Sequence, residues 1–229
     1  MAQRRKGRST EEQERRVADL RALDLFSGVG DQRLSQLTLL SRWREYGRRQ
    51  PIDLRRDEDR AWIVVWGGLL LVCVSPAGRT QGVNRFQRGQ FFRSTVPWLP
   101  EEDYILPRTM AEGATVCSAP YPVFLETVAS SPTAVAEALS VTDAVIQQLQ
   151  SLSASLTLHD APFRVRRTLL DASVENPWHE AHYTLEEIAW LAGTTPARAS
   201  EVIADLARRG HIRRLGRARL VVLHPDDDS

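Results

Sequence analysis

Residues 184–212, TLEEIAWLAGTTPARASEVIADLARRGHI, carry the most regular pattern of the chain. Thr184 and Glu187 stand three residues apart, the spacing of a capping box in which each side chain accepts a hydrogen bond from the other residue's backbone N–H. Ile188 follows at helical spacing, and Gly193 is typical of a helix end. The pattern predicts a short helix that begins after Thr184 and ends before Gly193.

A second helix and a hairpin are predicted directly afterwards. Pro196 suits the first position of a helix capped by Thr195, and Gly210 suits its end. The following run HIRRLGRARLVVLHP then indicates a two-stranded hairpin that turns at Gly216. Two helices, a tight turn and a hairpin make a winged helix-turn-helix, whose second helix fits the major groove of DNA.

Basic residues are concentrated in this segment, although the formal net charge of the 229-residue chain is only +1. Between Pro196 and Arg219, seven arginines stand against two acidic residues, an excess of five positive charges. Such an excess is what neutralising DNA phosphates requires. A winged helix that docks on a protein partner remains an alternative. The seven are Arg198, Arg208, Arg209, Arg213, Arg214, Arg217 and Arg219.

The chain before this module changes character three times. Residues 1–16 hold six basic and three acidic side chains without hydrophobic periodicity, which predicts a flexible basic arm. Leucines at helical spacing over 17–42 predict short helices, and 44–128 alternate β-rich runs with turn signals. We expect residues 17–130 to form a β-sandwich or rolled sheet preceded by helices, with a hairpin at 76–78.

Residues 131–160 predict one long helix. Ser131 is suited to cap it, and Pro132 to its first position. The seam residues are spaced alternately four and three apart, as in a helix that pairs with another helix. Packing on its own domain is the alternative, and the two polar members weaken the seam. The seam consists of Val135, Leu139, Thr142, Ile146, Leu149, Ser153 and Leu156.

Several classes of protein have no support in the sequence. The N-terminus has no apolar segment after its basic residues, and the longest apolar run, 61–75, is too short for a membrane helix, so we expect a soluble cytoplasmic protein. We expect no cofactor, no metal and no enzymatic activity, because nucleophile–base motifs, phosphate loops and metal triads are missing. Cys73 and Cys117 lie in apolar runs, which indicates inert thiols. The HEAH of 179–182 is interpreted as a surface loop.

The combination of parts resembles the cyclic-AMP receptor protein/FNR (CRP/FNR) family of bacterial transcription regulators. The resemblance covers about residues 23–223 and is carried by 184–212, by LDLFSGVGDQRLSQL at 23–37 and by the β-rich run 60–92. It implies an α+β fold with a cyclic-nucleotide-binding-like β-roll over 17–130, a dimerisation helix over 131–160 and the winged helix-turn-helix over 161–229. It also implies a homodimer on a two-fold symmetric DNA site, with RNA polymerase as a further partner.

The family's cyclic-nucleotide site matches this sequence poorly. Arg93 and Ser94 stand where the family's Gly–Glu pair begins the phosphate cassette, and Tyr104 stands where its phosphate-pairing arginine falls without a gap. Arg108 and Thr109 imitate the Arg-Ser/Thr pair only with a four-residue insertion. We therefore expect no response to cyclic AMP. Another effector remains an alternative to a pocket filled by side chains such as Phe91, Trp98 or Tyr104. The candidate pocket residues are Phe91, Arg93, Ser94, Tyr104, Arg108 and Thr109.

The recognition helix also departs from the family. Members that read the common half-site place Arg, Glu and Arg where this chain has Pro196, Ala197 and Glu201. We expect a different half-site, in which Arg198 pairs with guanine or phosphate, Glu201 accepts from cytosine and Ala197 meets a thymine methyl group. The predicted DNA contacts are Thr195, Ala197, Arg198, Ser200, Glu201, Arg213, Arg214, Arg217 and Arg219.

Overall fold

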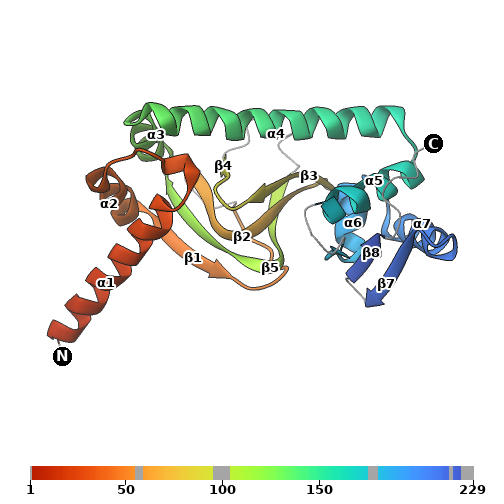
Figure 1. The fold of residues 1–229 in the computed structure, drawn as a ribbon, viewed down its shortest axis with the longest axis horizontal. Coiled ribbons are helices and arrows are strands. Elements are labelled where there is room, and N and C mark those ends of the chain that lie inside the picture. The colour runs from red at the N-terminus through yellow and green to blue at the C-terminus, as the bar shows by residue number, and fades with distance from the viewer. Residues whose placement is uncertain (1, 55–58, 95–103, 175–179, 217–218, 223–229) are drawn as a thin grey trace. The chain divides into compact units, whose positions relative to one another are not determined.

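The computed structural model describes residues 2–54, 59–94, 104–174, 180–216 and 219–222 of the chain. They fall into two compact units, Met1–Leu71 with Arg85–Gln147, and Val72–Asn84 with Gln148–Ser229. The first unit contains the N-terminal helices and most of a β-sheet, and the second contains the tip of one hairpin and the C-terminal helices (Figure 1).

Helices open the chain, where the sequence predicted an arm without regular structure over 1–16. That prediction is wrong for residues 2–16, which belong to the first helix. Arg, Glu and Gln are good helix formers, and Arg16 pairs with Glu12 one turn earlier at 2.5 Å. The helix then buries Val17 and Leu20, which anchors it. The elements are α1 (Ala2–Arg21), η1 (Asp24–Phe26) and α2 (Asp31–Leu40).

A five-stranded antiparallel sheet follows, in the order β1-β5-β2-β3 with β4 paired to β2. Its two longest strands are neighbours in the sheet and approach each other closely at two glycines. Gly67 has a φ of +74°, and a Cβ atom there would lie 2.1 Å from the carbonyl oxygen of Gly113. The hairpin at 76–78 is confirmed by the N–H of Gly78, which donates to the oxygen of Ser75 at 2.8 Å. The strands are β1 (Arg42–Tyr46), β2 (Arg60–Val74), β3 (Thr80–Gln87), β4 (Phe91–Arg93) and β5 (Tyr104–Pro120).

The core of the first unit lies between one face of this sheet and the helices beside it. Ala61 and Ile63 of β2 pack there against Leu20, Leu34 and Phe124. Cys117 is buried in the same core, and burial raises the pKa of its thiol to about 12, so it is protonated near neutral pH. The predicted burial is therefore confirmed for Cys117, whereas Cys73 is half-buried.

Two helices follow the sheet, α3 (Tyr121–Ala129) and α4 (Pro132–Leu158). The hydroxyl of Ser131 accepts from the N–H of Ala134 at 3.3 Å, so the predicted cap is confirmed. In α4 only Ala134 is buried among the described residues. The predicted seam is solvent-exposed in the single chain: Val135 (38%), Leu139 (65%), Ile146 (47%), Leu149 (41%) and Leu156 (40%) are exposed to these fractions, and Thr142 and Ser153 are exposed too.

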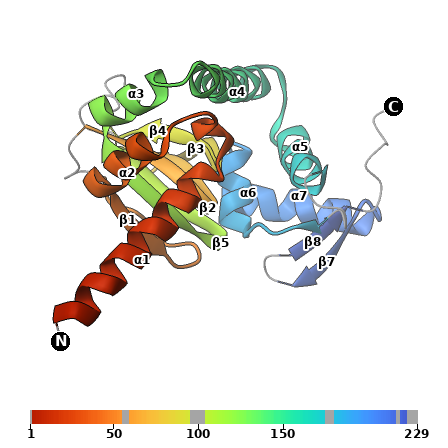
Figure 2. The ribbon, with the colours of Figure 1, turned by 60° about the vertical axis from the view of Figure 1, so that its left-hand side comes forward.

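The C-terminal part of the second unit combines three helices with a small antiparallel sheet in the order β6-β8-β7 (Figure 2). The elements are α5 (Ala161–Val174), β6 (Glu180–Ala181), α6 (Leu185–Leu191), α7 (Pro196–Arg208), β7 (Ile212–Gly216) and β8 (Arg219–Val222). The predicted fold class, an α+β chain with a β-roll, a long helix and a winged helix-turn-helix, is confirmed. No helix of the described residues is long and apolar enough to cross a membrane.

Candidate nucleic-acid interface

Helix α6 is fixed at its start by the predicted capping box. The N–H of Glu187 donates to the hydroxyl oxygen of Thr184 at 3.2 Å, and the N–H of Thr184 donates to the carboxylate of Glu187 at 2.6 Å. Ile188 and Ala189 are buried, and Gly193 ends the helix with a φ of +58°. The reciprocal cap gives α6 a defined first turn although it has only seven residues.

Helix α7 begins at the predicted residue and buries one face. The hydroxyl oxygen of Thr195 accepts from the N–H of Arg198 at 3.2 Å, and Pro196 occupies the first turn. Val202 and Ile203 turn into the core of the module. The opposite side of the first two turns is open to solvent, with Ser200 half-buried at its margin and with Thr195, Ala197, Arg198 and Glu201 exposed.

The arginines of α7 and of its C-cap are paired with acidic side chains in the single chain. Arg198 Nη1 lies 2.8 Å from Glu201 Oε2, and Asp205 accepts from both Arg208 and Arg209 at 2.8 Å. Exposed ion pairs contribute only about 0–1 kcal/mol, so a phosphate or a base can displace them. The Arg198–Glu201 pair joins two predicted contact residues into one surface group.

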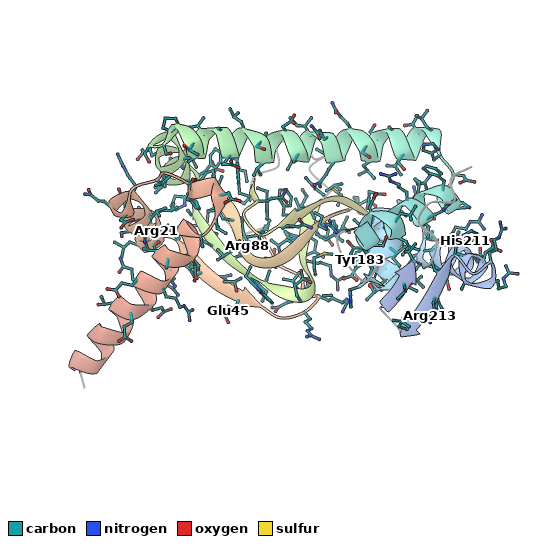
Figure 3. All side chains as sticks on the ribbon, viewed as in Figure 1. Arg21, Glu45, Arg88, Tyr183, His211 and Arg213 are labelled. Carbon is teal, nitrogen blue, oxygen red and sulfur yellow. The ribbon has the colours of Figure 1, made fainter. Side chains whose placement is uncertain are left out.

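The wing presents further basic side chains. Arg213 and Arg214 of β7 are exposed, and Figure 3 shows Arg213 extending from that strand. β7 pairs with β8 through Ile212 and Val222. Arg217 lies outside the described residues, and for Arg219 the structure describes the backbone in β8.

The structure does not bring the predicted effector-pocket residues together. Phe91 faces the helix side of the sheet, where its ring lies 4.7 Å from that of Phe124, so the prediction that it fills the roll is wrong. Arg93 points outward, forms a bidentate pair with Asp59 at 2.6 Å and covers the ring of Tyr121 at 4.3 Å. The Asp59 hydrogen bond raises the pKa of Arg93.

The other candidates are also dispersed. The Ser94 hydroxyl accepts from the N–H of Arg60 at 2.9 Å, and the Thr109 hydroxyl donates to the oxygen of Gly47 at 2.6 Å. Arg108 donates to the carbonyl of Arg49 at 3.3 Å, and Tyr104 is 38% exposed. Trp98 lies outside the described residues. Arg108 and Thr109 thus both bond to the segment 47–50, whereas Ser94 bonds to the start of β2.

A different group of aromatic residues occupies the face of the sheet opposite the helices, and the sequence did not single it out. The rings of Trp62 and Phe92 stack with centroids 6.1 Å apart, and Phe86 lies 5.0 Å from Phe92. All three are at least nine-tenths buried. Trp62 Nε1 is buried without a hydrogen-bond acceptor among the described residues. Successive side chains of a strand point to opposite faces of the sheet, so once β4 is paired with β2, Phe91 and Phe92 must lie on different faces.

The HEAH segment lies only partly within the residues that the structure describes. Glu180 and Ala181 belong to β6, paired with Val221 and Leu220 of β8, so the prediction of a surface loop is wrong there. His179 lies outside the described residues. In the ranges that the structure describes, no three histidine, cysteine or acidic side chains gather closely enough to hold a metal.

The architecture is that of the CRP/FNR transcription regulators, so the resemblance in sequence is confirmed at the level of the fold. A mutant of CooA from Carboxydothermus hydrogenoformans is similar with a TM-score of 0.68 at 17% identity, over 82% of this chain and 85% of that one. The c-di-GMP responsive global regulator CLP of Xanthomonas campestris is similar with a TM-score of 0.69 at 17% identity, over 85% of this chain and 100% of that one. A CRP-family transcriptional regulator from Thermus thermophilus, TTHB099, is similar with a TM-score of 0.64 at 21% identity, over 80% of this chain and 92% of that one.

Comparison with protein-family models gives no match, and comparison with curated proteins gives none either.

Proposed function

We propose that the chain is a homodimeric, sequence-specific DNA-binding transcription regulator that does not respond to cyclic AMP and has no enzymatic activity. The observation that carries this proposal is the exposed first half of α7, capped by Thr195 and bearing Arg198 and Glu201. A helix held in this way can enter a major groove, because only its inner face is needed for packing. RNA polymerase is a further proposed partner.

Three segments of the chain have different proposed roles. Residues 17–130 are the sensor-like β-roll, 131–160 the dimerisation helix and 161–229 the DNA-binding domain. Dimerisation is supported by the apolar side chains of α4, which are exposed in the single chain at the spacing of a paired helix. A second copy of the chain would cover these side chains, because its own α4 carries a seam of the same length and spacing.

The contact residues receive distinct roles. Arg198 would pair with guanine or a phosphate, Glu201 would accept from cytosine and Ala197 would meet a thymine methyl group. The remaining residues would contact phosphates or neighbouring polar groups, which fix the register of the protein on DNA. These are Thr195, Ser200, Arg213, Arg214, Arg217 and Arg219.

Independence from cyclic AMP is supported by what lies on the two faces of the sheet. The cyclic-nucleotide cassette lacks its glutamate at Ser94, and Arg93 is already paired with Asp59. The rings of Trp62, Phe86 and Phe92 pack against one another on the face opposite the helices. A phosphate placed among these rings would lose its hydration without a charged partner.

Two alternatives each rest on an observation. The buried Nε1 of Trp62 would gain an acceptor from an apolar effector that carries one polar atom, which favours gating by another small molecule. Leu215 on the wing is 43% exposed, which favours a protein-interaction module. Both predict little DNA binding by the purified protein alone.

Selection of bound duplexes from a random DNA pool, without added ligand, tests the proposal. We expect a two-fold symmetric motif with half-sites about one helical turn apart. Addition of cyclic AMP should leave the recovered motif and its enrichment unchanged. Recovery of background sequences alone would favour the alternatives, and cyclic-AMP-dependent enrichment would contradict the effector part of the proposal.

A further inference from the structure

The connection between α4 and α5 consists of two residues with defined contacts. The carboxylate of Asp160 accepts from the N–H of Phe163 at 3.0 Å, which caps the start of α5. The ring of His159 stacks on that of Phe163, with centroids 3.8 Å apart and an interplanar angle of 22°. The direction of α5 relative to the last turns of α4 is therefore constrained from its first turn.

Arg164 joins this corner to the helix-turn-helix. Its Nη1 donates to the carbonyl oxygen of His159 at 2.7 Å. Its Nε donates to the carbonyl of Ala192 at 2.7 Å, and its Nη2 to that of Gly193 at 3.0 Å. One guanidinium thus holds the end of α4 and the end of α6 together.

Two of the accepting carbonyls lie at the C-terminal end of α6. Ala192 is the C-cap of α6, and Gly193 begins the turn that leads to α7. Carbonyls at a helix C-terminus lack intrahelical partners and carry partial negative charge, so a cation there is favourable. The rigid fork of arginine can reach three oxygens at once, whereas the ammonium of lysine is a single point on a flexible stem.

Two further contacts converge on the same turn. A Cβ atom on Gly193 would lie 2.4 Å from Cδ2 of Leu156 and 2.9 Å from Oε1 of Gln81. Gln81 Nε2 donates to the carbonyl of Trp190 at 2.8 Å. The end of α6 is therefore held from outside the helix-turn-helix, by α4, by the first turn of α5 and by the hairpin tip of the same unit.

We infer that Arg164 is a positioning residue that fixes the direction of α7 relative to the end of α4, and so sets the half-site separation that a dimer accepts. The inference rests on the proposed function. In a dimer joined through α4, each recognition helix would reach its groove only if the α4-to-α7 geometry were fixed. Loss of the fork should therefore affect simultaneous engagement of two half-sites more than contact with one.

The test compares Arg164→Lys and Arg164→Gln with Arg167→Lys in the full-length protein. Arg167 is a matched control, since it lies on the same helix, is 63% exposed and, among the described residues, forms an i,i+4 pair with Asp171 at 3.0 Å. Affinities are measured for duplexes with the selected spacing, with one base pair added or removed, and with a single half-site. The unfolding temperature of each variant is measured in parallel.

We expect wild-type protein and Arg167→Lys to prefer the selected spacing, and the Arg164 variants to lose about tenfold in affinity there, equivalent to about 1.4 kcal/mol. The spacing preference should flatten, while affinity for the single half-site stays near wild type and the variants remain folded at the temperature of the binding measurement. An unchanged spacing profile would overturn the inference, as would an equal loss on the single half-site. A wild-type protein without any spaced motif would overturn the proposed function itself.

Discussion

Arg198 and Glu201 stand one turn apart on the exposed side of α7, and each balances the charge of the other in the free chain. Their side chains are 51% and 64% exposed, so water screens the pair and little free energy is lost when it opens. Guanine offers two acceptors to a guanidinium, and an adjacent cytosine offers a donor to a carboxylate. The ion pair therefore orients both side chains, yet it is weak enough to be replaced by contacts with bases.

Replacing Arg198 by Ala should weaken binding to the selected half-site by about 1–3 kcal/mol and relax selection at one base pair. Competition binding against duplexes substituted at each position measures both effects. Arg208→Ala is the control, because Arg208 has a comparable ion pair to Asp205 but stands at the opposite end of α7. That variant should weaken all sequences alike. An equal, sequence-independent loss in both variants would contradict base recognition by Arg198.

At the scale of elements, the close approach of β2 and β5 depends on glycine. Gly67 and Gly78 have almost the same φ, +74° and +72°, but a Cβ atom at Gly78 would meet nothing within 4 Å. Both Ala substitutions should lose about 1–2 kcal/mol from the left-handed backbone. Gly67→Ala should lose about 1–3 kcal/mol more by overpacking against Gly113. Urea-unfolding midpoints measure the difference, and equal shifts would show that the strands can separate without loss.

The α4 seam yields a prediction about assembly. Leu139→Asp should dissociate the dimer or weaken it by at least about tenfold, because a carboxylate would have to be desolvated between two helices. Leu158→Asp is the control, since Leu158 is 72% exposed on the same helix but lies off the seam. Sedimentation measurements on both variants distinguish the two positions. A monomeric wild-type protein, or dimers that tolerate both changes, would contradict pairing through α4.

The winged helix-turn-helix could be predicted because its signals are local. The caps at Thr184 and Thr195 are bonds between residues three apart, and proline and glycine mark the same helix ends in the sequence as in the structure. The segment 1–16 was predicted to be a flexible arm because it has no hydrophobic periodicity. A helix that is buried only at its C-terminal end needs little such periodicity over its exposed turns.

The sensor-like half was harder to predict because its contacts are distant in sequence. Whether Phe91 or Phe92 faces the helices is decided by the register of β4 on β2, more than 25 residues earlier in the chain. Arg164 reaches carbonyls 28 and 29 residues away, so it looked like one more arginine on a helix. The fold class was still predicted correctly because it depends on the order of elements.

At the scale of the whole molecule, the charge distribution predicts how the proposed DNA binding would depend on salt. Each module has an excess of five positive charges between Pro196 and Arg219, and a dimer presents two modules. The logarithm of affinity should fall with the logarithm of salt concentration with a slope on the order of −5 to −9. Fluorescence anisotropy over a series of potassium chloride concentrations measures it. A slope near zero would favour a winged helix that docks on protein.

The polar residues Thr142 and Ser153 on α4 affect how promoter occupancy would depend on the concentration of the protein. A short seam interrupted twice should pair only moderately, so free chains and pairs would coexist. While free chains predominate, doubling their number raises the number of pairs about fourfold. Occupancy of a symmetric promoter would then rise with the square of expression, and the rate of synthesis would itself serve as the input signal.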